Sequence, residues 1–440
     1  FANPPRPTKP FPSTINVSGV PGTINKLRVR LNGVSMGSFE QDIDLLLAGP
    51  GGQKMLLMSD VDTTCVISNQ NFTFDDAAPS DLAGFNCVTG NYKPKDNPPA
   101  DTFPAPAPSA PFQTTLAVFN GTNPNGTWSL YMVDDASSFG GSQTIAGGWT
   151  LFFGPDSPNT FVVINTNTSG PGSLTQAILD ANNHLGVDSI VFNIPANLSP
   201  FVIDGAPPNI IDPVTIDATT QPGFAGKPIV EVHGGFFISG GSTTLRGFVI
   251  NTLGSYGVRI RDNGNNIIEG NYIGINRAGD AGQGAQFGPN GIDIDTANNI
   301  VGGTTAPARN IIANVTHGVM FSTFADDPNT TADDASNNLI EGNFIGLNAD
   351  GTAIIPISHA CVTSRSAPGS PSNTIGGTSA GAGNVLSGGS FPSGVDLVYS
   401  GSHGYLVQGN FIGTDVTGTK AFAPIPGAPH AANNDGVAIS

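Results

Sequence analysis

The feature that most constrains this chain is an internal repeat in its C-terminal two thirds. The block EGNYIGI, which begins at Glu269, returns as EGNFIGL from Glu341 and as QGNFIGT from Gln408. A second block, NNIVGGTTAPARNII (298–312), returns as SNTIGGTSAGAGNVL (372–386). Units of a few tens of residues cannot each bury an apolar face alone, so they must stack on their neighbours.

Short segments that begin with glycine and alternate apolar with variable residues recur inside the repeat. They are GVRI from residue 257, GIDI from 291, GVMF from 318, GVDL from 394 and GVAI from 436. An alternation of period two is typical of strands with one buried face. The sequence therefore predicts a solenoid of short parallel strands from residue 161 to residue 440.

Three asparagine pairs precede apolar strands of this solenoid: Asn265–Asn266, Asn298–Asn299 and Asn337–Asn338. Stacked turns would place these side chains above one another, where amide groups can hydrogen bond from one rung to the next. We expect a structural asparagine ladder along the solenoid.

One helix is expected, at the entry to the solenoid. Ser173 and Gln176 have the spacing of a capping box. The apolar residues after Ser173 fall on one helical face; they are Leu174, Ala177, Ile178 and Ala181. Such a helix would cover the open first rung and protect its strand edge.

Residues 13–153 have a different pattern, between an N-terminal extension (1–12) and a linker (154–160). The expected strands lie in KLRVRLNGV (26–34), DIDLLLAGP (42–50), QKMLLMSDV (53–61), TTLAVF, GTWSLYMVDD and GGWTLFF. The segment KPKDNPPADTFPAPAPSAP (93–111) is rich in proline, which central strands exclude, and should form a long exposed loop. An antiparallel sandwich is the expected fold of this region.

Several blocks of this first region resemble the P domain, the jelly roll that follows the catalytic domain in subtilisin-like proprotein convertases and many bacterial secreted proteases. The blocks are DIDLLLAGPGGQKMLLMSD, FTFDDAAP, FNGTNPNGTWSLYMVDD and GGSQTIAGGWTLFF. The resemblance implies an all-β jelly roll that is not catalytic and that stabilises or targets its neighbour. The sequence holds no protease domain ahead of it.

The second region resembles bacterial secreted and surface proteins that fold as a right-handed parallel β-helix. This resemblance rests on GSLTQAILDANNHLGVDSIVFNIP, on VTIDATTQPGFAG and on the repeated GN-apolar-IG blocks. It implies a bacterial protein at the cell surface or outside the cell, with any signal peptide removed. The scaffold alone does not decide the function, because it carries lyases, hydrolases and adhesins alike.

Composition limits the classes of partner. The chain has 33 acidic residues against 16 Lys and Arg, a net charge of −17, so no broad basic face is expected for nucleic acid. No window of about 18 apolar residues predicts a membrane span. Cys65 and Cys87 either form a disulfide or remain buried thiols, and Cys361 stands alone. The dispersed histidines do not suggest zinc.

Aspartates at strand ends of the first region are candidate ligands for a structural Ca²⁺ ion; the chain is expected to bind either no cofactor or this ion alone. Carboxylate oxygens are hard ligands that calcium prefers, but aspartate is also common as a turn and cap residue. The preferred set is Asp42, Asp44, Asp60, Asp134 and Asp135, and Asp62, Asp75 and Asp76 occupy similar positions.

Strand register predicts a charged cluster on the solenoid. If GVRIR and GIDID stack in register, Arg259 and Arg261 lie beside Asp293 and Asp295, about 4.8 Å away on the outer face. Such a cluster could bind sugar acids or cleave glycosides; the alternative, which we favour, is an exposed ion-pair patch. Ser379 fits a G-x-S-x-G motif, but the preceding repeat has threonine there, which favours a rung turn over a nucleophile.

The leading interpretation is a non-catalytic structural or adhesive protein, secreted or on the cell surface, that could form part of an extracellular filament or matrix. Its last strand, GVAIS, could stack end to end on another copy, and a glycan or surface ligand is a further possible partner. One alternative is a carbohydrate-active enzyme, either a polysaccharide lyase or a glycoside hydrolase, with the jelly roll as accessory module. Another is the non-catalytic portion of a larger secreted protease.

Overall fold

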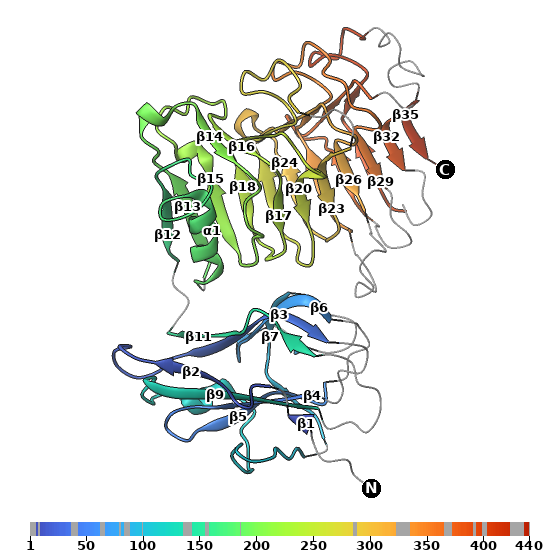
Figure 1. The fold of residues 1–440 in the computed structure, drawn as a ribbon. Coiled ribbons are helices and arrows are strands. Elements are labelled where there is room, and N and C mark those ends of the chain that lie inside the picture. Colours follow the sequence, from blue (N-terminus) through green and yellow to red (C-terminus); the bar gives the residue numbers. More distant parts are fainter. Residues whose placement is uncertain are drawn as a thin grey trace. The chain divides into compact units, whose positions relative to one another are not determined.

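The computed structural model describes residues 6–7, 9–36, 43–61, 67–78, 81–82, 89–98, 100–134, 143–154, 158–184, 186–284, 288–322, 335–364, 372–389, 393–397, 403–422 and 435–439. The chain divides at residues 156–157 into two compact units, each of which has its own apolar core. Both units consist mainly of strands (Figure 1). No helix among the described residues has the length and hydrophobicity that a membrane crossing needs.

The first unit contains two sheets. Its strands are β1 (Arg6–Pro7), β2 (Ser13–Val17), β3 (Leu27–Met36), β4 (Ile43–Ala48), β5 (Lys54–Ser59), β6 (Ile67–Phe74), β7 (Gly90–Tyr92), β8 (Lys95–Asp96), β9 (Gly126–Asp134), β10 (Thr144–Ile145) and β11 (Trp149–Phe153). One sheet has the order β1-β9-β4-β5-β8, with β2 also on β9; the other has the order β10-β3-β6-β7, with β11 also on β3. Most pairs are antiparallel, but β8 joins β5 and β7 joins β6 in parallel.

The core of this unit draws apolar side chains from both sheets. Trp128 on β9 is fully buried there, and its Nε1 donates to the carbonyl of Pro124 at 2.8 Å. A buried indole with a satisfied N–H is a core residue and cannot serve as a platform for sugar stacking.

The expected strand TTLAVF is instead a 3₁₀ helix, η2 (Leu116–Phe119). Leu116 and Phe119, three residues apart, are both buried on one side of this turn. The carboxylate of Asp76 accepts hydrogen bonds from the N–H groups of Leu116 and Ala117, at 2.9 and 2.8 Å. A distant cap therefore decides the local conformation, and a short apolar run does not reveal it.

The second unit is a solenoid of three parallel sheets, as the repeats predict. The nine-stranded sheet contains β12 (Thr160–Val163), β13 (Asp188–Phe192), β15 (Val214–Asp217), β18 (Thr244–Arg246), β21 (Ile267–Glu269), β24 (Ile300–Gly302), β27 (Leu339–Glu341), β30 (Thr374–Gly376) and β33 (Leu406–Gln408). The eight-stranded sheet contains β14 (Phe201–Asp204), β16 (Val230–His233), β19 (Phe248–Asn251), β22 (Tyr272–Ile273), β25 (Ile311–Ile312), β28 (Phe344–Ile345), β31 (Val385–Leu386) and β34 (Phe411–Ile412). The seven-stranded sheet contains β17 (Phe236–Ile238), β20 (Tyr256–Ile260), β23 (Asn290–Ile294), β26 (Val319–Phe321), β29 (Val362–Ser364), β32 (Ser393–Leu397) and β35 (Asp435–Ile439).

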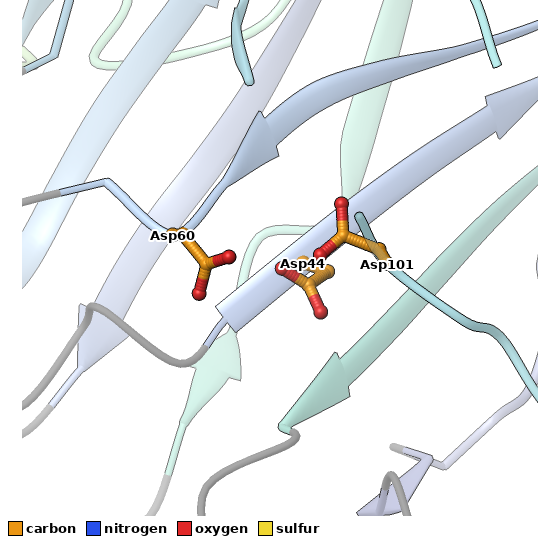
Figure 2. Close-up of side chains that lie close together, drawn as sticks. All are labelled: Asp44, Asp60 and Asp101. Carbon is orange, nitrogen blue, oxygen red and sulfur yellow. The ribbon is translucent and has the colours of Figure 1, made fainter. Parts of the chain in front are cut away.

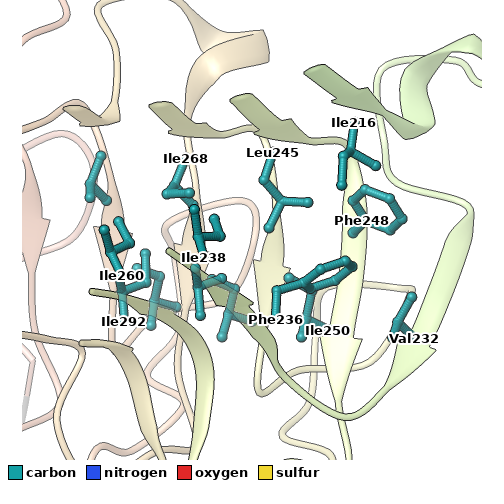
Figure 3. Packing of buried hydrophobic residues seen from close by; sticks show 14 of the residues in the cluster. Ile216, Val232, Phe236, Ile238, Leu245, Phe248, Ile250, Ile260, Ile268 and Ile292 are labelled. Atoms are coloured by element: carbon teal, nitrogen blue, oxygen red, sulfur yellow. The ribbon is translucent and has the colours of Figure 1, made fainter. Parts of the chain in front are cut away.

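Aliphatic and phenylalanine side chains from successive rungs fill the interior of the solenoid (Figure 3). Ile238, Ile260 and Ile294 lie opposite one another in consecutive strands and are fully buried. The five glycine-led segments all lie in the seven-stranded sheet, and the inward orientation predicted for Val258, Ile260, Ile292 and Ile294 is confirmed.

The entry helix is α1 (Leu174–Asn182), and its four predicted apolar positions are buried in the solenoid core. The Ser173 side chain accepts a hydrogen bond from the N–H of Gln176 at 3.1 Å, which is one half of the expected capping box. Gln176 itself donates to Asp180 at 2.8 Å instead of turning back to the cap residue. The other short helical turns of this unit are η3 (Ala196–Leu198), η4 (Ala218–Thr220) and η5 (Ala306–Ala308).

The asparagine ladder is confirmed for the second member of each pair. The Oδ1 atom of Asn299 accepts from both the main-chain N–H and the side chain of Asn266, at 2.9 and 2.8 Å, and Asn338 does the same for Asn299. The first member of each pair has a positive φ, between 54° and 63°. Asparagine tolerates this left-handed turn better than most residues, which explains why the pair recurs.

A second ladder was not foreseen. It runs through the asparagines that precede the eight-stranded sheet, namely Asn271, Asn310, Asn343, Asn384 and Asn410. Four of its members are fully buried. The Gly-Asn or Arg-Asn step ahead of each strand was its signal in the sequence.

Candidate functional site

Three carboxylates of the first unit converge at one point (Figure 2). Asp44 lies on β4, Asp60 directly follows β5, and Asp101 belongs to the proline-rich segment after β8. One oxygen of each lies within 4.8 Å of the others. Asp44 is 1% exposed and Asp101 7% exposed, so three acidic groups share a poorly hydrated site.

The surrounding contacts fix the backbone of this site. The Ser59 hydroxyl donates to the Asp101 carboxylate at 2.7 Å, and the Asn97 side chain donates to the Asp60 carbonyl at 2.8 Å. Asp60 has a φ of 47°, which turns the chain sharply at the end of β5. An all-oxygen set of carboxylates suits a hard divalent cation such as Ca²⁺, which would offset their mutual repulsion.

The structure thus places two of the five preferred calcium candidates, Asp44 and Asp60, side by side. Asp134 ends β9 opposite Ile43 and does not belong to the group. Asp42, Asp62 and Asp135 lie outside the described residues, as do Cys65 and Cys87. Asp75 forms an ion pair with Lys26 at 2.8 Å, and Asp76 caps η2.

Asp101 is the ligand candidate that sequence reasoning missed, because residues 93–111 were expected to form an exposed loop. Much of that segment is exposed, but Asp101 is buried. Phe103 packs edge to face on Phe112, with ring centroids 5.6 Å apart, beside the buried Leu46 and Tyr131. In the sequence, only the aspartate and phenylalanine among the prolines of PPADTFP indicated that part of this segment is buried.

The second candidate is the charged cluster of the solenoid, and its predicted register is correct. Arg259 lies opposite Asp293 on the neighbouring strand. The carboxylate of Asp295 lies 3.2 Å from Nε of Arg261 and 3.9 Å from Nη2 of Arg259, and it accepts a hydrogen bond from the Ser322 hydroxyl at 2.7 Å.

The expectation that this cluster is an exposed patch is wrong. Asp293 is 2% exposed and Asp295 is 3% exposed, although both occupy outer positions of the sheet. Burial raises the pKa of Asp293 to about 7 and the pKa of Asp295 to about 6, against the lowering effect of the arginines. Strand alternation places a side chain on the outer face but does not show whether other parts of the chain cover it.

Two other residues singled out in the sequence, Ser379 and Cys361, lie in surroundings that indicate a structural role. Ser379 lies in an exposed turn between β30 and β31, where its carbonyl accepts from the N–H of Ala382 at 3.1 Å. Cys361 is fully buried in the solenoid core, and burial raises the pKa of its thiol to about 12. It is therefore a core side chain, not a metal ligand or nucleophile.

Comparison with models of protein families, with curated proteins and with solved structures gave no match. The resemblances of the two regions therefore remain expectations.

Proposed function

We propose that the chain is a non-catalytic structural or adhesive protein of the cell surface or extracellular space. In this proposal the first unit is a jelly roll of the P-domain type and the second is a right-handed parallel β-helix. The observation that carries the proposal is the pair of buried asparagine ladders, which tie successive rungs together on two sides. Each rung uses buried polar groups to hydrogen bond to its neighbour. These groups stabilise the shape of the scaffold and take no part in a reaction.

The outer faces of the solenoid support the same proposal. A second apolar cluster covers the eight-stranded sheet, where Tyr272, Ile311 and Phe344 pack under the loop residues Ile275 and Leu347. On the seven-stranded sheet the carboxylates that an enzyme would use are almost fully buried. A polymeric substrate has no direct access to them in this conformation.

Strands β33, β34 and β35 offer a surface for assembly. Phe411 is 46% exposed, whereas Phe344 and Val385, which hold the same position in preceding rungs, are each 3% exposed. Leu406 and Ile439 are also exposed, by 49% and 74%. Stacking of a further rung would bury these side chains, and in this proposal the rung comes from a second copy in a head-to-tail contact, the type that builds filaments.

Electron microscopy and sedimentation of the purified chain over a range of concentrations test this assembly. We expect elongated oligomers, and we expect the double variant F411S/I439S to remain monomeric. Leu198→Ser is the matched control, because Leu198 is 39% exposed elsewhere on the same unit. Monomers at every concentration would remove the filament from the proposal.

A second candidate function, a carbohydrate-active enzyme, is favoured by the raised pKa values of Asp293 and Asp295. A pair in which one carboxyl is protonated and the other ionised near neutrality is what acid–base cleavage of a glycoside requires. Turnover of a panel of neutral and acidic polysaccharides by the chain and by D295N separates the two functions. The structural proposal predicts no turnover above the background of D295N.

A further inference from the structure

We propose that Arg309 is an anchor for an acidic polysaccharide. Its guanidinium binds one carboxylate or sulfate group of the polymer at the corner between the nine-stranded and the eight-stranded sheet. The proposal rests on the adhesive role proposed above, and it names the class of ligand that such a role needs.

Arg309 differs from the other arginines of the solenoid because it has no acidic partner. It follows η5 directly and forms no ion pair with a carboxylate of the described residues. Every other described arginine of this unit has such a partner: Arg246 pairs with Asp217 and Glu269, Arg259 and Arg261 with Asp295, and Arg277 with Glu231. Burial lowers the pKa of the Arg309 guanidinium. A partly desolvated cation without a counter-ion is stabilised when it binds an anion.

The guanidinium is held in a fixed orientation. Its central carbon lies 4.0 Å from the centroid of the Phe344 ring, and its Nε donates to the Gly342 carbonyl at 3.0 Å. Phe344 is 3% exposed, and a methyl group on Gly351 would lie 2.8 Å from its ring, so the platform under the guanidinium is itself tightly packed. Binding therefore costs little side-chain entropy.

The remaining hydrogen-bond donors of Arg309 match an oxyanion. Arginine has five N–H groups in a planar fork that can bind two oxygens of one anion. The N–H groups on Nη1 and Nη2 make no hydrogen bond to a described residue, and the protein does not enclose them. An oxyanion can therefore reach the fork from solvent.

The internal repeat indicates that the fold does not require an arginine at this position. In the block 372–386, Gly383 occupies the place that Arg309 has in the block 298–312. The ladder asparagines that follow, Asn310 and Asn384, make equivalent hydrogen bonds in the two blocks. The arginine side chain is therefore available for a role outside the ladder.

The neighbouring turns favour a sugar polymer as the carrier of the anion. Four hydroxyl residues are exposed on the turn ahead of Arg309 and on its equivalent in the later block, namely Thr304, Thr305, Thr378 and Ser379. The two turns stack directly, since a methyl group on Gly381 would collide with the Thr304 carbonyl oxygen. Hydroxyl donors and acceptors along one edge suit the hydroxyl groups of a linear sugar chain. The net charge of −17 opposes non-specific uptake of an acidic polymer, so binding should depend on this cation.

Biolayer interferometry of the full chain at physiological salt tests the site with polygalacturonate, dextran sulfate and uncharged dextran as probes. We expect binding of an acidic polymer and none of dextran, and the acidic polymer that binds identifies the oxyanion. Arg309→Met keeps an unbranched side chain over Phe344 but removes the guanidinium, and it should weaken binding about tenfold or more. Lys227→Met is the matched control, because it removes one positive charge from an exposed position of the same unit and should leave the affinity unchanged.

Equal affinities of R309M and K227M would overturn the proposal, as would a wild-type chain that binds neither acidic polymer or binds dextran equally well. If R309M fails to fold, phenylglyoxal labelling of the wild-type chain, followed by peptide mapping, decides the matter. The bound polymer should protect Arg309 from modification, and labelling at an unchanged rate would refute the anchor. The assembly of the wild-type chain is measured separately, so a failure of this site is distinguishable from a failure of the structural role.

Discussion

At the scale of the residue, a single buried ladder asparagine satisfies hydrogen-bonding groups on several neighbouring residues. Asn299 accepts two hydrogen bonds from Asn266 and donates to both Thr296 and Asn338. Truncation of such a side chain leaves several buried partners unsatisfied, and each of these typically costs about 1–3 kcal/mol.

We expect Asn299→Ala to lower the free energy of unfolding by about 3 kcal/mol or more, measured by chemical denaturation. Asn197→Ala, at an exposed position in η3, is the control and should have little effect. Equal losses in the two variants would mean that the ladder adds nothing beyond an ordinary surface asparagine.

The thiol of Cys361 leads to a second expectation at this scale. It is fully buried, its pKa is raised to about 12 by burial, and it lies 3.5 Å from the Ser387 carbonyl oxygen. Iodoacetamide at pH 8, followed by peptide mapping, should leave Cys361 unlabelled in the native chain and label it after unfolding. Rapid labelling of the native chain would show that the core opens at this rung.

At the scale of the element, close stacking of turns makes particular glycines indispensable. Gly346, after β28, has a φ of 80°, and a methyl group there would lie 1.6 Å from the Ser387 carbonyl oxygen. The neighbouring rung is main chain and cannot move aside, so the repeated IG step is a packing requirement as well as a turn signal.

Gly346→Ala should therefore destabilise the solenoid by more than the roughly 1 kcal/mol typical of unfavourable glycine substitutions. The control is Gly254→Ala, where the added methyl group has no neighbour within 4 Å and the φ is not positive. A melting temperature of G346A close to that of G254A would contradict the packing argument.

The carboxylate cluster of the first unit also belongs to this scale, because β4, the end of β5 and the segment after β8 each supply one member. Calcium should raise the melting temperature, by an amount equivalent to about 2.7 kcal/mol at a concentration of 100 times Kd. Asp101→Asn should abolish the shift, and Asp134→Asn should leave it intact. A shift that survives D101N would place the ion elsewhere.

At the scale of the whole molecule, the contacts of the second unit could be predicted from the sequence more fully than those of the first. In the solenoid each ladder asparagine bonds to a partner one rung away, so a recurring motif reveals both the strand and its neighbour. The strands of the seven-stranded sheet and the asparagine pairs were predictable for this reason. In the first unit, contacts such as that between Asn32 and Thr150 join distant segments that no repeat announces.

The expectations from the sequence that were wrong or incomplete share one physical origin, which is contact with a remote segment. Asp101 reaches its partners across more than 40 residues, Asp76 caps η2 from 40 residues away, and Asp293 is buried on a face that alternation places outside. Local pattern identifies a strand and its inward side. It does not show which remote segment covers a position or completes a site.

The ladder geometry has a consequence for how such a chain can change over generations. Successive members are separated by 33, 39 and 35 residues, so the loops absorb differences in length while the bonding pattern stays constant. Each of these rungs brings one side-chain acceptor for the rung before it and a main-chain donor for the rung after it. Duplication or loss of a whole rung therefore keeps the main-chain bonds of the ladder paired, so a solenoid of this kind can lengthen or shorten by whole rungs while this bonding pattern is preserved.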